Sequence, residues 1–187
     1  MGVKLFLLQF AFLYAPFVHP PMEQIGPGLY RGPDPKVREI YELHDKGFKT
    51  IISIRTNAED KKRRLCDKLG MRWVHISTGV FKTPSEDQFD QFRAIINKPE
   101  NLPCLVSCEL GMDRAGVYIA AHRMADENWS AQQMEEEFRT HHQKRWWPVF
   151  RKYQKHVVGY AGRRQGQQYY AQAPVASDEY QAEARLR

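Results

Sequence analysis

The stretch LPCLVSCELGMDRAGVYIAAHRM, residues 102–124, decides the predicted fold. It opens with the apolar run 103–108, which is typical of a buried strand, and continues into the alanine-rich stretch 114–127, which is typical of a helix. Cys108 ends the strand, and Arg114 follows six residues later, in the first turn of the helix. The sequence therefore predicts a tight strand–loop–helix connection with a thiol at its start and a guanidinium at its end.

The rest of the chain alternates between short apolar runs and longer amphipathic ones. Strands are predicted at 29–31, 49–56 and 72–77, and helices at 35–47, 58–70, 83–97, 128–142 and 146–162. Three capping signals mark helix starts. They are Asp34 before Pro35, Thr83 with Pro84 and Glu86, and Ser130 with Gln133. This alternation predicts an α/β fold with a central, mostly parallel sheet flanked by helices.

Length and charge restrict the class of protein. The chain has 187 residues, 42% of them hydrophobic, and carries a net charge of +6. We expect one domain over residues 23–162, a disordered tail over 163–187 and an anionic partner. Nucleic acid is not favoured, because the basic residues form no stripe interleaved with aromatic residues.

The first 22 residues contain the apolar run 5–18. Its length fits a signal-peptide core and is too short for a comfortable membrane span, but no small-x-small cleavage site follows. Two interpretations stay open: an export signal, with a periplasmic or extracellular protein, or an uncleaved apolar segment of a cytoplasmic one. We expect contact with a membrane only through this N-terminal segment.

The three cysteines, Cys66, Cys104 and Cys108, predict neither a disulfide framework nor a metal site. Cys104 and Cys108 lie on one predicted strand with α-carbons roughly 13 Å apart, too far to bridge. No Cys or His spacing typical of zinc occurs, and we expect no metal and no cofactor.

The predicted loop after Cys108 has the properties of an anion site. Ligands gather at the carboxyl ends of strands in such folds, and Glu109, Leu110, Gly111 and Met112 can point their backbone N–H groups at one spot before the helix. Gly111 permits the tight turn, and the planar fork of Arg114 can hold two phosphate oxygens. The same field favours the thiolate of Cys108, a nucleophile for phosphoryl transfer.

The motif CELGMDRAG, residues 108–116, resembles the signature loop of the protein tyrosine phosphatase superfamily. The resemblance covers roughly residues 27–160 and includes LYRGPDP, TIISIR, HISTGVFKTPSEDQF and AAHRM. The layout is most similar to compact bacterial dual-specificity-type phosphatases and to tyrosine-phosphatase-like phytases, which act on inositol phosphates. The resemblance implies that Cys108 is the nucleophile, Arg114 the phosphate clamp, and the backbone of Glu109–Arg114 the phosphate cradle.

Three positions depart from the family pattern. Ser107 stands where the family usually has His, and Ala115 where it has Ser or Thr. The stretch STGVFK, 77–82, lacks the Asp that normally protonates the leaving oxygen. A general acid contributes on the order of 10²–10⁴ in rate, so its identity matters.

Asp113 is the first candidate for this acid, because myotubularin-type lipid phosphatases resemble this loop in having an Asp directly before the arginine. The alternative is that Asp113 only interacts with the helix dipole. Glu86 and Asp87 lie near the usual acid loop, although the predicted cap accounts for Glu86. His75 is expected to be structural, and an activated leaving group or water could make an acid unnecessary.

Charged residues expected near the mouth are Lys82, Lys144 and Arg145, which either attract a polyanionic substrate or are solvated surface charges. The aromatic stretch 145–148 and Trp129 are expected to pack as core and rim.

These observations predict a cysteine-dependent phosphatase that hydrolyses phosphomonoesters, with inositol phosphates as the leading substrate class. Phosphotyrosine or other phosphoproteins are the next substrates. A catalytically impaired phosphate-binding module and a redox-sensing thiol protein are the alternatives from other classes.

Overall fold

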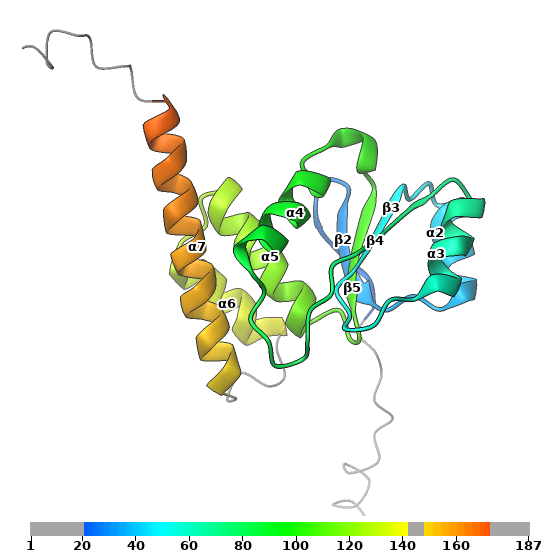
Figure 1. Cartoon of the computed structure of the whole chain (residues 1–187), viewed down its shortest axis with the longest axis horizontal. Helices are drawn as coiled ribbons and strands as arrows, with labels where there is room; N and C mark the ends of the chain where they lie inside the picture. The colour runs from blue at the N-terminus through cyan, green and yellow to red at the C-terminus, as the bar shows by residue number, and fades with distance from the viewer. Residues whose placement is uncertain (1–20, 142–147, 173–187) are drawn as a thin grey trace, which may run out of the picture. The chain divides into compact units, whose positions relative to one another are not determined.

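Five short strands form a single sheet in the computed structural model, which describes residues 21–141 and 148–172 (Figure 1). The strands are β1 (Glu23–Gly26), β2 (Leu29–Pro33), β3 (Thr50–Ser53), β4 (Arg72–His75) and β5 (Cys104–Cys108). The helices are α2 (Val37–Asp45), α3 (Asp60–Lys68), α4 (Glu86–Ile96), the 3₁₀ turn η2 (Pro99–Asn101), α5 (Asp113–Asp126), α6 (Ala131–His141) and α7 (Pro148–Gln172).

The sheet order is β1-β2-β5-β3-β4, and the four strands from β2 to β4 in this order run parallel. The predicted mostly parallel sheet, with the Cys108 strand at its centre, is confirmed. Its register pairs Pro33 and Ser53 with Cys108 and Ser107 of β5, respectively. The carboxyl ends of three strands therefore meet around the thiol.

Strand β1 was not predicted. It pairs antiparallel with β2 across a turn at Gly28, whose φ of 68° is in the left-handed region. Its four residues, Glu23–Gly26, are exposed or half-buried and show no apolar alternation, so only pairing with β2 identifies them as a strand.

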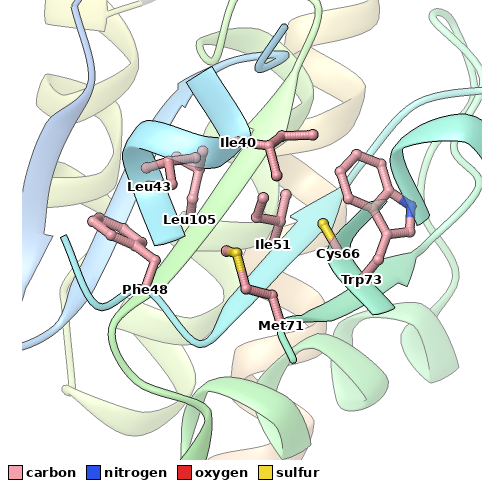
Figure 2. Packing of buried hydrophobic residues seen from close by; sticks show 8 residues of the cluster. All are labelled: Ile40, Leu43, Phe48, Ile51, Cys66, Met71, Trp73 and Leu105. Atoms are coloured by element: carbon pink, nitrogen blue, oxygen red, sulfur yellow. The ribbon is translucent and has the colours of Figure 1, made fainter. Parts of the chain in front are cut away.

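Helices α2 and α3 cover one face of the sheet. Their buried side chains meet those of the strands and the turns between them in one apolar cluster, which Figure 2 shows. Its members are Ile40, Leu43, Phe48, Ile51, Cys66, Met71, Trp73 and Leu105. The β-branched and aromatic composition of these strands suits a sheet buried on this face.

Helix α4 lies on the other side of the sheet from α2 and α3 (Figure 1). Its Phe89 and Phe92 are fully buried and contact the ring of Tyr118 edge-on, with centroids 5.2 and 5.5 Å away. These contacts join α4 to the first turns of α5, the helix that follows the Cys108 loop.

Two predicted caps were placed at the wrong residues. Helix α4 begins after Ser85, whose Oγ accepts from the N–H of Gln88 at 3.2 Å. The sequence contains two overlapping capping boxes, and the downstream one forms, with Pro84 and Phe89 at the positions of a hydrophobic staple. The predicted cap pair Thr83 and Glu86 is therefore wrong.

The predicted cap at Asp34 is also wrong. Helix α2 begins after Lys36, whose N–H donates to Glu39 at 2.7 Å. The Asp34 side chain is instead bound by two cations, described below. The third predicted cap is confirmed, because Ser130 and Gln133 bond to each other reciprocally before α6.

The chain packs as two compact units that divide after Tyr118, within α5. In the second unit, the Arg123 guanidinium lies 4.3 Å from the ring centroid of Trp129 and 3.1 Å from Glu137. Helix α7 runs to Gln172, so residues 163–172 are helical where a disordered tail was expected. Gln165 donates to the Met124 carbonyl at 2.8 Å, a tertiary bond that local composition does not encode.

Several predictions lie outside the described residues. They concern the apolar run 5–18, the cations Lys144 and Arg145, and the tail beyond Gln172. Within the part of the chain that the structure describes, no helix has the length and apolar character needed to cross a bilayer.

Candidate active site

The thiol of Cys108 lies at the carboxyl end of the central strand and is almost fully buried. Only Glu109–Met112 separate it from α5, whose first residue is Asp113. The predicted strand–loop–helix connection is present as expected, with the N-terminus of α5 directly after the loop.

Gly111 makes this loop sterically feasible. Its φ is 72°, and a Cβ atom built on it would lie 2.2 Å from the carbonyl carbon of Gly32. Gly32 belongs to β2, the strand next to β5. The backbone of the loop at Gly111 therefore packs directly against the backbone of β2 at Gly32, and only glycine fits at position 111.

Arg114 is buried and hydrogen-bonded to a neighbouring loop. Its side chain is buried, and its Nη1 donates to the Thr78 carbonyl at 3.2 Å. The same carbonyl accepts from Thr56 Oγ1 at 3.3 Å, and the Thr78 hydroxyl lies 2.7 Å from that of Tyr118. The loops after β3 and β4 are therefore tied to the first turns of α5.

A small pocket of about 140 Å³ opens beside these groups. Its lining residues are Arg55, Thr56, Asn57, Val80, Glu109 and Arg114. Two of the predicted site residues, Glu109 and Arg114, line it, and Cys108 directly precedes Glu109 in the chain. The other four residues were not predicted.

Arg55 is the most informative of these four because it carries a charge. It follows β3, which lies next to β5 and runs parallel to it. Charged residues just after parallel strands gather at one edge of the sheet, so the end of TIISIR contained a usable signal. What the sequence did not reveal is that β3 and β5 are neighbours.

Arg55 belongs to a cluster of five charged side chains. Its Nη1 contacts Asp34 at 2.5 Å and Glu59 at 3.3 Å, and its Nη2 contacts Glu109 at 3.0 Å. Lys62 completes the cluster, 2.5 Å from Asp34 and 2.8 Å from Glu59. Burial by itself would lower the pKa of Arg55, but the three carboxylates, Asp34 foremost, raise it.

The candidate acids occupy different positions. Asp113 is half-buried in the first turn of α5, and Glu86 and Asp87 lie in the first turn of α4. Because Ser85 and Gln88 form the cap, capping no longer accounts for Glu86. The Nε2 atom of His75 lies 2.9 Å from the Arg55 carbonyl, a contact that fits the structural role expected for this histidine.

The remaining predicted residues differ in exposure. Lys82 is exposed in the loop that also carries Val80, whereas the Met112 side chain is buried. The two atypical positions are both fully buried: Ser107 donates to the Ile52 carbonyl at 3.4 Å, and Ala115 lies in the first turn of α5.

The other two thiols are chemically unlike a nucleophile. Cys66 and Cys104 are fully buried, and all three cysteines are free. Burial raises the pKa of Cys66 to about 11 and that of Cys104 to about 12, so both stay protonated at neutral pH. Within residues 21–141 and 148–172, no three His, Cys, Asp or Glu side chains are grouped to hold a metal ion.

Comparison with known proteins identifies the family of the chain. Residues 23–148 match a family model described as a DSP-PTPase phosphatase fused to NAD+ kinase. The chain belongs to this family of dual-specificity and tyrosine phosphatases, and it is a cysteine-dependent phosphatase. No curated protein sequence matches it.

Solved structures share the fold. The core catalytic domain of the PP-IP phosphatase SIW14 from S. cerevisiae superposes with a TM-score of 0.65 at 18% identity, covering 76% of this chain and 87% of that one. TpbA from P. aeruginosa has a TM-score of 0.62 at 19% identity, covering 77% and 90%. Tk-PTP in its active form gives 0.62 at 22% identity, covering 79% and 99%.

Proposed function

We propose that this phosphatase hydrolyses inositol phosphates through a cysteinyl-phosphate intermediate. The observation that carries the proposal is the pocket lined by Glu109, the residue directly after Cys108, and by two guanidinium groups, those of Arg55 and Arg114. A polyanionic substrate suits such a pocket and the net charge of +6. SIW14, whose fold is similar, is a phosphatase of PP-IP.

Cys108 is the proposed nucleophile. Its thiolate attacks phosphorus, a sulfur–phosphorus bond forms, and the bond from phosphorus to the leaving oxygen breaks. Arg114 and the N–H groups of Glu109–Arg114 stabilise the charge that develops on the equatorial oxygens. Water then attacks phosphorus, releasing inorganic phosphate and regenerating the thiolate.

Asp113 is the proposed general acid, donating its proton to the leaving oxygen. Its position in the first turn of α5, directly before Arg114, supports this role. Glu86 and Asp87, in the first turn of α4, are the alternatives. The acid matters most for an inositol leaving group, because its alkoxide is a much poorer leaving group than nitrophenolate.

Phosphotyrosine is the second candidate substrate. The loop between β4 and α4 presents Val80 and Phe81, which are 55% and 64% exposed, and Val80 lines the pocket. An apolar rim of this kind can pack against a phenyl ring. TpbA, a similar fold, has been solved in complex with pTyr.

The test is phosphate release from inositol hexakisphosphate, a phosphotyrosine peptide and para-nitrophenyl phosphate. We expect turnover by the wild type and none by Cys108→Ser. A clear preference for the peptide over inositol hexakisphosphate would overturn the proposed substrate class.

The acid is tested by Asp113→Asn, with Asp87→Asn as the matched control. We expect Asp113→Asn to lose on the order of 10²-fold or more on the inositol substrate, and less on para-nitrophenyl phosphate. A full rate on the inositol substrate removes Asp113 from the mechanism, and a comparable loss in Asp87→Asn moves the role to α4.

A further inference from the structure

A second guanidinium shares the pocket with Arg114. Arg55 lines the same small space, and its side chain is 29% exposed, so part of it faces outward from the charged cluster. The phosphoryl transfer described above acts on one phosphate group and requires a single clamp, which Arg114 provides. Arg55 therefore has no part in that mechanism.

The two sides of the Arg55 guanidinium are bound differently. Its Nη1 is fixed by Asp34, which is 12% exposed, and by Glu59, which is 20% exposed. Lys62 holds both of these carboxylates from the other side. A guanidinium anchored in this way is preorganised, so a ligand that uses its other edge pays little to order the side chain.

Among the residues that the structure describes, the other edge, Nη2, contacts only a carboxylate that is largely in solvent. Its partner Glu109, 3.0 Å away, has a side chain that is 61% exposed and also lines the pocket. Exposed ion pairs contribute little, so an incoming anion can displace Glu109 from Nη2 at small cost. A phosphate, with its higher charge, is the stronger competitor for this edge.

We propose that Arg55, together with the exposed amide of Asn57, forms a second anion subsite beside the one at Arg114. It receives another phosphate group of the same substrate, either the next group of a diphosphate or a neighbouring phosphate monoester. Glu109 occupies this subsite in the free enzyme and leaves it when the second phosphate binds. The inference rests on the proposed function and specifies its substrates as molecules with at least two phosphate groups.

The test compares orthophosphate with pyrophosphate as inhibitors of para-nitrophenyl phosphate hydrolysis. Orthophosphate fills one subsite and pyrophosphate can span two. For the wild type we expect pyrophosphate to bind about tenfold more tightly than orthophosphate. Arg55→Gln should bring the two inhibition constants close together, and Glu109→Gln should widen the difference.

Lys62→Gln is the matched control. It removes the same positive charge from the same cluster, but Lys62 does not line the pocket. We expect its ratio of inhibition constants to equal that of the wild type. An equal loss in Lys62→Gln and Arg55→Gln would show a general charge effect and overturn the proposal, as would a wild type that does not prefer pyrophosphate.

If Arg55→Gln does not fold, Arg55→Lys replaces it, because it keeps the charge and loses the planar guanidinium. Its preference for pyrophosphate over orthophosphate should be smaller than that of the wild type but not absent. Shifts in melting temperature on adding orthophosphate or pyrophosphate give the same comparison without turnover. The two proposals fail separately. A preference for pyrophosphate without hydrolysis of inositol phosphates would contradict the proposed substrate class. Hydrolysis of inositol phosphates without a preference for pyrophosphate would contradict the proposed subsite.

Discussion

At the scale of single residues, the loop Glu109–Met112 depends on a close approach between two glycines. Gly111 adopts a φ of 72°, and the space that its Cβ would need is filled by the backbone of Gly32. A side chain at 111 would have to push the loop away from β2, and the backbone N–H groups proposed to bind phosphate would move with it. The chemistry proposed for Cys108 thus depends on the close approach of the Gly111 and Gly32 backbones.

Gly111→Ala should therefore destabilise the fold and remove activity together. We expect a loss of roughly 2–4 kcal/mol in the free energy of unfolding, because left-handed strain and a backbone clash add. Gly47→Ala is the control, since its φ is 81° but nothing lies within 4 Å of its Cβ position. It should cost only about 1 kcal/mol and keep activity. Denaturant unfolding and hydrolysis of para-nitrophenyl phosphate measure both; equal losses would contradict the role of Gly32.

At the scale of elements, α4 follows the loop that carries Val80 and Lys82, so its start determines where that loop ends. Ser85 caps the helix, whereas Thr83 Oγ1 is buried with no hydrogen-bond partner among the described residues. The Ser85 hydroxyl therefore stabilises the start of α4, whereas the Thr83 hydroxyl does not contribute to the cap.

Ser85→Ala should lower the free energy of unfolding by about 1 kcal/mol, because the N–H of Gln88 loses its acceptor. Thr83→Val preserves shape and removes only the unpaired hydroxyl, so it should be neutral or slightly stabilising. Urea denaturation of both variants distinguishes the two capping boxes. A larger loss in Thr83→Val would restore Thr83 as the cap.

Strand β5 carries a second, structural thiol that makes stability depend on pH. Burial raises the pKa of Cys104 from its usual 9.0 to about 12, so the folded protein keeps this proton at pH values where the unfolded chain has lost it. The resulting stabilisation is complete below the unfolded pKa and disappears as the pH rises through the folded one. By about pH 10.5 the free energy of unfolding has fallen by roughly 2 kcal/mol for this reason.

Cys104→Ala should be less stable than the wild type at neutral pH, because it leaves a small cavity, but its alkaline decline should be shallower. Melting temperatures of both proteins between about pH 8 and pH 10.5 test this. Parallel curves would mean that Cys104 does not ionise on unfolding in this range.

At the scale of the whole molecule, the net charge of +6 adds a long-range attraction to the local contacts. The charged cluster around Arg55 contributes little to it, since its two cations face three carboxylates. The attraction for a polyanion therefore comes from the rest of the surface and is subject to screening by salt.

The KM for inositol hexakisphosphate should consequently rise on the order of tenfold between low and high ionic strength, while that for para-nitrophenyl phosphate changes little. Steady-state kinetics in increasing sodium chloride measure this. A salt dependence that is the same for both substrates would show that surface charge does not select polyanions.

The sequence by itself determined the features that lie within one short segment. The apolar run 103–108, the glycine at 111 and the helix that starts near Arg114 are contiguous, so local propensity and spacing were enough to predict the strand, the loop and the helix. The alternation of strands and helices similarly predicted the parallel sheet.

Only the tertiary structure decided the partners of that loop. Arg55 and the Thr78 carbonyl come from segments 59 and 36 residues before Arg114; Arg55 contacts Glu109 of the loop, and the Thr78 carbonyl accepts from Arg114. Asp34 reaches the loop through Arg55. These contacts depend on the strand order, in which β5 lies between β2 and β3 and β4 lies beyond β3. Strand order depends on how whole layers pack, and no local pattern encodes it. For the same reason Asp34 was predicted as a helix cap: its local context matched one, but its charge is stabilised by cations 21 and 28 residues further along the chain.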